Sequence, residues 1–247
     1  MSTGDVENHL SQWFKSPLGR YVLRFEEELF DDAVRDAFGY TAIQIGFPEK
    51  NFLKLNRIAN RVIISGGLDA SISAELSLLP IKSSSVDLVL LPHTLECSLD
   101  PHAVIREVER ILVPGGRVVI SSLNPLSMFG LRYRCWGVKE GPAKCKELVS
   151  LQRIKDWLKL VSIEVESGRM GCYVLPFQSE KWRERFGFLE FAGDRWWPIF
   201  GGVYFLQGVK KVRGMRLVMP NWGNFGYRNK VAPTPRREVI NHSSEEG

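Results

Sequence analysis

The spacing of apolar residues between positions 16 and 76 predicts one long helix and several short strands. Ser16-Pro17 suits a helix start, with serine as the N-cap and proline in the first turn. We expect buried strands at residues 41–45 and 61–65, a brief strand at 72–76, and a short amphipathic helix that begins at Pro48 and runs to Ile58. The long helix is predicted from an apolar series that recurs at helical spacing up to Gly39: Leu18, Tyr21, Val22, Phe25, Leu29, Val34 and Phe38.

The middle of the chain predicts a strand–helix–strand unit. Residues 86–91 (VDLVLL) are apolar apart from Asp87, which is typical of a strand covered on both faces. Asp100-Pro101 is expected to cap a helix, which ends at Pro114-Gly115-Gly116 before the buried strand 117–121 (RVVIS). A crossover of this kind joins parallel strands.

Further strand and helix patterns follow in the C-terminal half. Ser150 is expected to cap a helix with an apolar stripe, and strands are expected at residues 162–166 and 203–209. Alternating strands and helices predict an α/β fold with a Rossmann-like, doubly wound sheet. In such sheets, ligands bind beyond the carboxyl ends of the strands, so the candidate site residues are those that follow each strand.

Composition and cysteine usage narrow the class of protein. Of the 247 residues, 44% are hydrophobic and 25% charged, as in globular proteins. No apolar run reaches the ~18 residues of a membrane-spanning helix. Asp5 and Glu7 precede any apolar stretch, the reverse of a signal peptide, so we expect a cytoplasmic protein. The cysteines show no CxxC pairing and the histidines no metal-ligand spacing, so we expect no metal site.

The net charge of +5 is distributed unevenly. Residues 1–100 carry 14 acidic and 9 basic residues, whereas residues 206–237 carry eight Lys or Arg and no acid. A basic segment that also contains Trp222, Phe225 and Tyr227 suits RNA or an anionic membrane surface. The alternative is a solvated strand followed by a tail, and the polar, proline-containing residues from Arg228 onward predict disorder.

Neither a GxGxxG fingerprint nor a Walker A sequence is present, which argues against NAD and ATP. Residues 78–125, LLPIKSSSVDLVLLPHTLECSLDPHAVIREVERILVPGGRVVISSLNP, instead closely resemble class I S-adenosylmethionine-dependent methyltransferases of the type 11 group. The PHTLE step, the DPH helix start, residues 124–132 and the RWWP at 195–198 are similar to the YafS-like proteobacterial branch, whose substrate is unassigned. The resemblance implies a mostly parallel seven-stranded sheet and S-adenosylmethionine as cofactor, with S-adenosylhomocysteine as product.

The resemblance also implies which residues bind the cofactor. In the family, the first strand ends in an acid and a GxGxG turn; here Gln44 holds the acidic position, Gly46 and Phe47 follow, and later glycines are replaced by Pro48 and Lys50. No residue clearly matches the acid that binds the ribose after the second strand. The adenine contact falls on Glu75 and Leu76, and the sulfonium and methyl group would lie beside Leu91, Pro92 and His93.

His93 is the candidate catalytic residue. It stands where a base would take a proton from a hydroxyl, an amine or a carbon acid. The alternative is a histidine bonded to the backbone or to Glu96 near the start of the next helix. For Asn124 we expect one of two roles, orienting a substrate or stabilising a turn. An apolar pocket floor and a place in the core are the two alternatives for Trp196, Trp197 and Phe200.

Three functions therefore remain open. The first is methyl transfer to a small apolar acceptor such as a quinone precursor or a lipid. The second is methyl transfer to RNA, with Lys210, Lys211, Arg213 and Arg216 as contacts. The third is a non-catalytic, methyltransferase-like binding protein with an impaired cofactor site. We expect an N-terminal helical segment at residues 1–39, the α/β domain at 40–218 and a flexible basic tail at 219–247; the sequence makes no statement on oligomeric state.

Overall fold

The computed structural model describes residues 3–67, 70–128, 130–131, 148–173, 193 and 195–211. All of them belong to one compact unit, Met1–Arg213, and the second unit, Gly214–Gly247, lies outside the described residues together with the predicted tail. No helix in the described part of the chain is long and apolar enough to cross a membrane.

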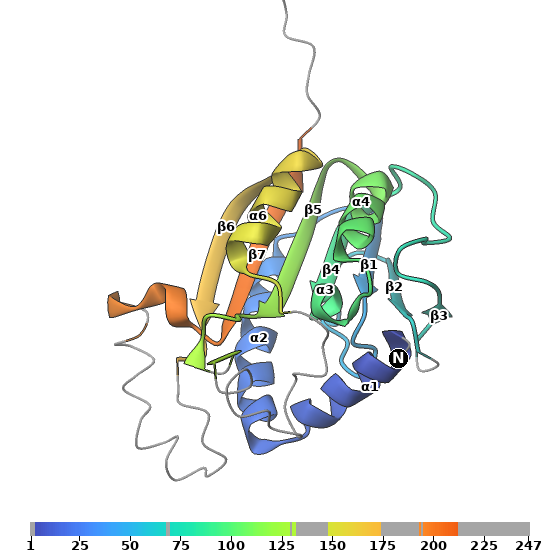
Figure 1. Ribbon diagram of the computed structural model, residues 1–247. Helices are drawn as coiled ribbons and strands as arrows, with labels where there is room; N and C mark the ends of the chain where they lie inside the picture. Colours follow the sequence, from blue (N-terminus) through green and yellow to red (C-terminus); the bar gives the residue numbers. More distant parts are fainter. Residues whose placement is uncertain are drawn as a thin grey trace, which may run out of the picture. The chain divides into compact units, whose positions relative to one another are not determined.

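A seven-stranded sheet forms the centre of the unit, in the order β3-β2-β1-β4-β5-β7-β6 (Figure 1). The strands β3, β2, β1, β4 and β5 run parallel to one another. The strand β7 is antiparallel to both of its neighbours, β5 and β6. The predicted doubly wound, mostly parallel α/β sheet is therefore confirmed, and the strand order reverses between β1 and β4. The strands are β1 (Thr41–Ile45), β2 (Asn60–Ser65), β3 (Ile72–Ser73), β4 (Val86–Pro92), β5 (Leu112–Leu123), β6 (Ile163–Gly171) and β7 (Val203–Lys210).

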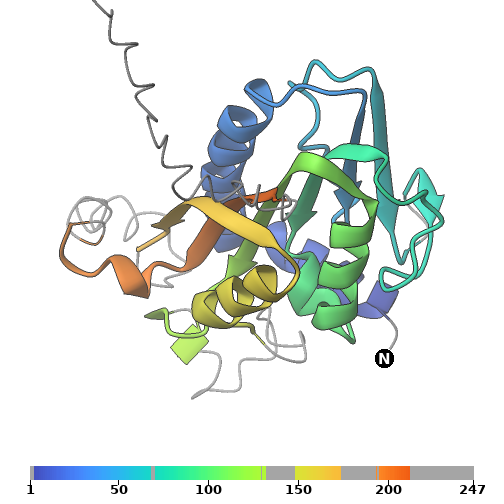
Figure 2. The same ribbon diagram turned by 90° about the horizontal axis from the view of Figure 1, so that it is seen from above.

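Helices cover both faces of this sheet, with α2 (Pro17–Arg35) on one face and α4 (Pro101–Ile111) and α6 (Leu151–Leu160) on the other (Figure 2). The three predicted N-caps are confirmed. The side chains of Ser16, Asp100 and Ser150 accept hydrogen bonds from the backbone N–H three residues later, at 3.0, 3.0 and 3.4 Å. Each cap satisfies a backbone donor that the first helical turn leaves unpaired.

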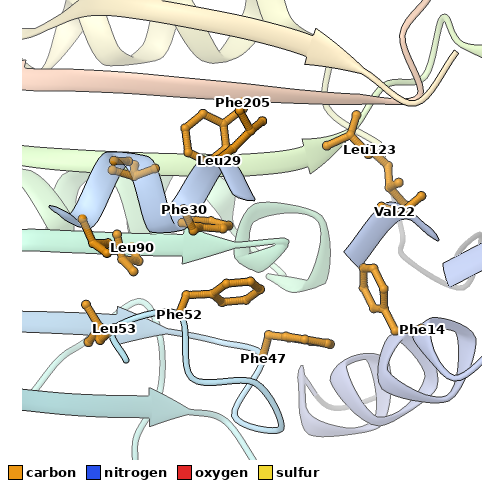
Figure 3. Packing of buried hydrophobic residues seen from close by; sticks show 14 of the residues in the cluster. Phe14, Val22, Leu29, Phe30, Phe47, Phe52, Leu53, Leu90, Leu123 and Phe205 are labelled. Carbon is orange, nitrogen blue, oxygen red and sulfur yellow. The ribbon is translucent and has the colours of Figure 1, made fainter. Parts of the chain in front are cut away.

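The apolar run of β4 contributes to two separate hydrophobic clusters. Leu90 packs in the cluster beneath α2, where the Phe30 ring lies 4.4 Å from Phe52 and 5.0 Å from Phe205 (Figure 3). Val89 points the other way, into the cluster under α4 and α6. Because successive strand residues alternate between faces, a strand covered on both sides must be apolar at nearly every position.

Two expectations for the N-terminal half are wrong. α2 ends at Arg35 rather than before Gly39, and the Phe38 side chain is 75% exposed. Residues 48–58 form turns and contain no helix, although Phe52 and Ile58 are buried. The chain also has a separate first helix, α1 (Thr3–Phe14), whose position the sequence did not predict.

Candidate functional site

The turn after β1 requires a glycine for two reasons. Gly46 and Phe47 both adopt left-handed backbone conformations, with φ of 82° and 47°. A Cβ atom on Gly46 would lie 2.9 Å from Oγ1 of Thr94, whose hydroxyl donates to the carbonyl of Ile45. Glycine tolerates positive φ and leaves room for this close approach.

Gln44 is fully buried, and its side chain forms hydrogen bonds to the backbone of the same turn. Its Nε2 lies 3.3, 3.0 and 2.7 Å from the carbonyl oxygens of Gly46, Phe47 and Lys50, and its Oε1 accepts from the N–H of Phe52 at 2.9 Å. The Gln44 side chain thus bonds the carbonyl of Lys50 and the N–H of Phe52, two groups that a helix over residues 48–58 would have bonded internally, so it competes with helix formation there. Gln44 shapes the turn, and its polar atoms face the backbone of the turn.

His93 follows β4 in a left-handed conformation, with φ of 53°, and precedes the short helix α3 (Thr94–Cys97). Its ring is 1% exposed; Nε2 lies 2.8 Å from Oε1 of Glu26 on α2, and Nδ1 contacts Oε1 of Glu96. Burial alone would lower the His93 pKa, but the charges and hydrogen bonds of Glu26 and Glu96 outweigh burial and raise the pKa to about 10. His93 therefore carries a proton at neutral pH, with both ring nitrogens engaged.

Glu96 extends this polar network to the end of β5, and Asn124 follows that strand with separate hydrogen bonds. Oε2 of Glu96 accepts from the hydroxyl of Ser122 at 3.2 Å and from the N–H of Leu123 at 3.1 Å. The Asn124 amide donates to the carbonyls of Ile199 and Gly201 at 2.8 and 2.9 Å. Asn124 thus joins two loops at the same edge of the sheet.

The helix α1 lies across the carboxyl ends of β1, β2 and β4 (Figure 1). The centroid of the Phe14 ring is 4.9 Å from those of Phe47 and His93, and Figure 3 shows Phe14 and Phe47 as neighbours, with their rings packed edge to face. Near the other end of α1, Oε2 of Glu7 accepts from the hydroxyl of Ser65 at 2.5 Å. Glu7 is 5% exposed, and this burial raises the pKa of its carboxyl group.

A cavity of about 10 Å³ remains between α1 and the strand ends, which is room for about one water molecule. It brings together four of the residues predicted as a site, Gly46, Phe47, Pro92 and His93. The other residues of its lining are Glu7, Leu10, Thr94 and Cys97. The cavity lies between the ends of β1 and β4, where the strand order reverses.

The remaining predicted site residues lie away from this cavity. Leu76 and Leu91 belong to the hydrophobic core. Glu75 is exposed after β3, and its Oε1 accepts from the Ser77 hydroxyl at 2.6 Å. Sequence reasoning missed Glu7, Leu10 and Glu26.

A larger, open hollow lies beside α6, lined by Lys155, Lys159 and residues 162–165. It sits where β6 begins, at the edge of the sheet opposite the carboxyl ends of β4 and β5. Because open α/β sheets bind ligands at the carboxyl edge, we do not assign a cofactor to this hollow.

The sequence of residues 45–120 matches the family described as "Methyltransferase domain". The uncharacterized protein YafS of Escherichia coli K12 is 30% identical over 155 residues, which are 62% of this chain and 65% of YafS. A ubiquinone biosynthesis O-methyltransferase of Xanthomonas oryzae pv. oryzae is 26% identical over 131 residues, covering 48% of this chain and 52% of that enzyme. The aligned regions thus span less than two thirds of each relative.

Solved structures agree with these matches at the level of the fold. An S-adenosylmethionine-dependent methyltransferase from Thermotoga maritima superposes with a TM-score of 0.59 at 18% identity, over 85% of this chain and all of that one. The domain match and the similarity to YafS thus show that residues 45–120 are similar to the methyltransferase domain of the class I, type 11 group, and the sheet order and the solved structures show the same fold.

Proposed function

We propose that the chain is an S-adenosylmethionine-dependent methyltransferase. One observation carries this proposal: the residues after β1 and those after β4 line one cavity at the point where the strand order reverses. Open α/β sheets bind their ligands at this point. The bound cofactor would supply an activated methyl group, so the protein needs chiefly to orient the reactants and to exclude water.

The residues at the cavity fit this cofactor in their chemistry. Oε1 of Glu7 is buried and has no hydrogen-bond partner within the described residues, so it can accept from a hydroxyl or amino group. Pro92 and the backbone of Gly46, which line the cavity, would contact the cofactor. The exposed Glu75 is our proposed acceptor for the adenine amino group. Since the cavity holds about one water molecule, the cofactor enters only when α1 moves away from the strand ends.

His93 enters the proposal as a positioning residue rather than as a general base. A base must be able to accept a proton, whereas this ring is already protonated at neutral pH and donates to two carboxylates. The ring fixes the segment after β4 against α2 and α3. Left-handed conformations at His93 and at Phe47 are held by this surrounding structure, as is common at ligand sites.

An apolar acceptor is supported by the surface beside the end of β5 and the start of β7. Asn124 joins the two loops there through the carbonyls of Ile199 and Gly201. These loops expose seven large apolar side chains, each between 47% and 71% accessible: Leu126, Met128, Leu131, Trp196, Trp197, Ile199 and Phe200. Exposed apolar groups in such numbers mark binding sites, and the similarity to a ubiquinone biosynthesis O-methyltransferase is consistent with a quinone precursor or a lipid as acceptor.

The RNA alternative receives less support from the described residues. Lys210 donates to the carbonyls of Glu109 and Leu112, at 2.5 and 3.0 Å, and pairs with the Glu109 carboxylate. Lys211 pairs with Glu164. Two of the four basic residues proposed to contact RNA are therefore engaged within the domain, and Arg213 and Arg216 lie outside the described residues.

The experiment is to incubate the protein with methyl-labelled S-adenosylmethionine and fractionated cell extract. We expect label in the organic-solvent fraction. Label in RNA would favour the second function. No transfer to any fraction, together with weak or absent binding of the cofactor, would favour the non-catalytic alternative with an impaired cofactor site, which the closed cavity motivates.

A further inference from the structure

The acid that the cofactor's ribose needs is missing from the usual place in this chain. In dinucleotide-binding sheets, an Asp or Glu about 20 residues after the glycine turn binds the ribose hydroxyl. Counting from Gly46 leads to the end of β2, where the chain reads Ser65-Gly66-Gly67; the next carboxylate in the sequence, Asp69, lies outside the described residues. The structure brings a carboxylate to this place from another element, the helix α1.

We propose that Glu7, carried by α1, is the carboxylate that binds the ribose hydroxyls of the cofactor, an assignment that rests on the function proposed above. Oε2 of Glu7 accepts from the Ser65 hydroxyl, and the oxygen of that hydroxyl accepts from the N–H of Gly67 at 3.0 Å. This short chain of hydrogen bonds fixes the carboxylate at the end of β2. The carboxylate lies near the backbone here, since a Cβ built on Gly67 would be 3.8 Å from Oε2 of Glu7, an ordinary contact distance.

The second oxygen of Glu7 supplies the independent indication of a ligand. Oε1 has no hydrogen-bond partner within the described residues, and Glu7 lines the cavity that Gly46 and Pro92 also line. Burying a carboxylate oxygen without a donor is costly. A ribose diol offers two O–H donors side by side, which would satisfy this oxygen. Burial raises the pKa of the Glu7 carboxyl group, and it outweighs the opposing effect of hydrogen bonds from the Ser65 side chain and from the backbone of Gly66 and Gly67.

The assignment gives α1 a defined part in binding. In this assignment the cofactor would displace the Leu10 side chain, which lines the cavity, while the hydrogen bond from Ser65 would keep Glu7 at the end of β2. An arrangement in which Glu7 competes with the ribose predicts the opposite change in cofactor affinity. If Glu7 merely occupied the ribose position as a competitor, removing its charge would tighten cofactor binding.

Equilibrium dialysis with labelled S-adenosylhomocysteine, in competition with its 2′,3′-dideoxy analogue, separates the two arrangements. We expect the wild-type protein to prefer the parent compound about ten- to a hundredfold, the range for a charge-assisted hydrogen bond. Glu7→Gln should lose most of that preference and bind the parent correspondingly more weakly. Glu28→Gln, which removes the same charge from an exposed position on α2, should behave as the wild type.

The outcomes are distinguishable. If the wild-type protein binds neither compound, both the proposed function and this assignment fail. If it binds both equally, or if Glu7→Gln keeps the preference or binds more tightly, only the Glu7 assignment is overturned. The comparison of the two compounds on the wild-type protein needs no variant, and thermal unfolding of Glu7→Gln verifies that the variant is folded.

Discussion

Glu26 and His93 are 67 residues apart in the sequence, yet Nε2 of His93 lies 2.8 Å from Oε1 of Glu26. The two side chains are 0% and 1% exposed, and the Phe14 ring covers the imidazole. This contact joins α2 to the end of β4 beside the candidate cofactor site. Because charges this deeply buried are stable only as a balanced set, each member depends on the others.

Removing Glu26 should therefore destabilise the fold strongly. We expect Glu26→Ala to lower the free energy of unfolding by about 3–5 kcal/mol, the range for breaking a buried ion pair. Urea denaturation measures the loss. Glu28→Ala, on the exposed side of the same helix, should change the free energy by about 0.5 kcal/mol or less. Equal losses in the two variants would mean that the Glu26–His93 pair is not a significant stabilising contact.

The protonated state of His93 predicts a pH dependence. The His93 pKa is about 10 in the folded protein and about 6.5 when unfolded, so the folded state holds a proton that the unfolded state releases between these values. Its contribution to stability is complete below pH 6.5 and falls as the pH rises toward 10, by up to about 1.4 kcal/mol per unit. Urea unfolding across this range measures the slope. A neutral His93 ring at pH 8 in nitrogen-15 NMR spectra would refute the assignment.

Two glycines with similar backbone angles test the turn after β1. Gly46 and Gly115 have φ of 82° and 80°, but a Cβ would meet Thr94 only at Gly46, and nothing within 4 Å at Gly115. Alanine at each position bears the same backbone strain, about 1 kcal/mol or more. We expect Gly46→Ala to be the less stable variant in thermal unfolding, by the cost of displacing Thr94. Equal melting temperatures would show that Thr94 yields freely.

Replacing Gln44 by the acid that the family carries at this position should destabilise the protein. Gln44→Glu replaces an amide donor by a carboxylate that faces the carbonyl oxygens of Gly46, Phe47 and Lys50. Leaving buried acceptors unpaired costs about 1–3 kcal/mol each, so we expect a large loss of stability. Chemical denaturation measures it. A variant that is as stable as the wild type and binds S-adenosylmethionine more tightly would show that the glutamine is a degenerate acid and not the support of the turn.

The strands and helix caps could be predicted because their determinants are local. The apolar run at 86–91 and the capping residues Ser16, Asp100 and Ser150 each specify structure within a few residues. The predicted helix at 48–58 is absent, and the Gln44 side chain, which lies outside that segment, bonds the Lys50 carbonyl and the Phe52 N–H in its place. The hydrophobic pattern of residues 48–58 does not show that a side chain outside the segment bonds its backbone groups.

The site itself was predicted in part, for the same physical reason. Gly46, Phe47, Pro92 and His93 follow strands that the topology brings together, so their positions could be inferred from strand order alone. Val6, Leu10, Trp13 and Phe14 recur at helical spacing, which is a signal for α1. The spacing does not say what the helix covers. That Glu7 reaches the end of β2, and Glu26 the ring of His93, follows only from tertiary packing.

Calorimetric titration of the whole chain with S-adenosylmethionine and S-adenosylhomocysteine tests the central claim most directly. The proposed site predicts saturable heat for one site per chain, with a dissociation constant on the order of 1 mM or tighter. It also predicts weaker binding by Glu75→Ala. No heat with either compound at millimolar concentration would contradict the account, and the cavity beneath α1 would then be part of a fold that does not bind this cofactor.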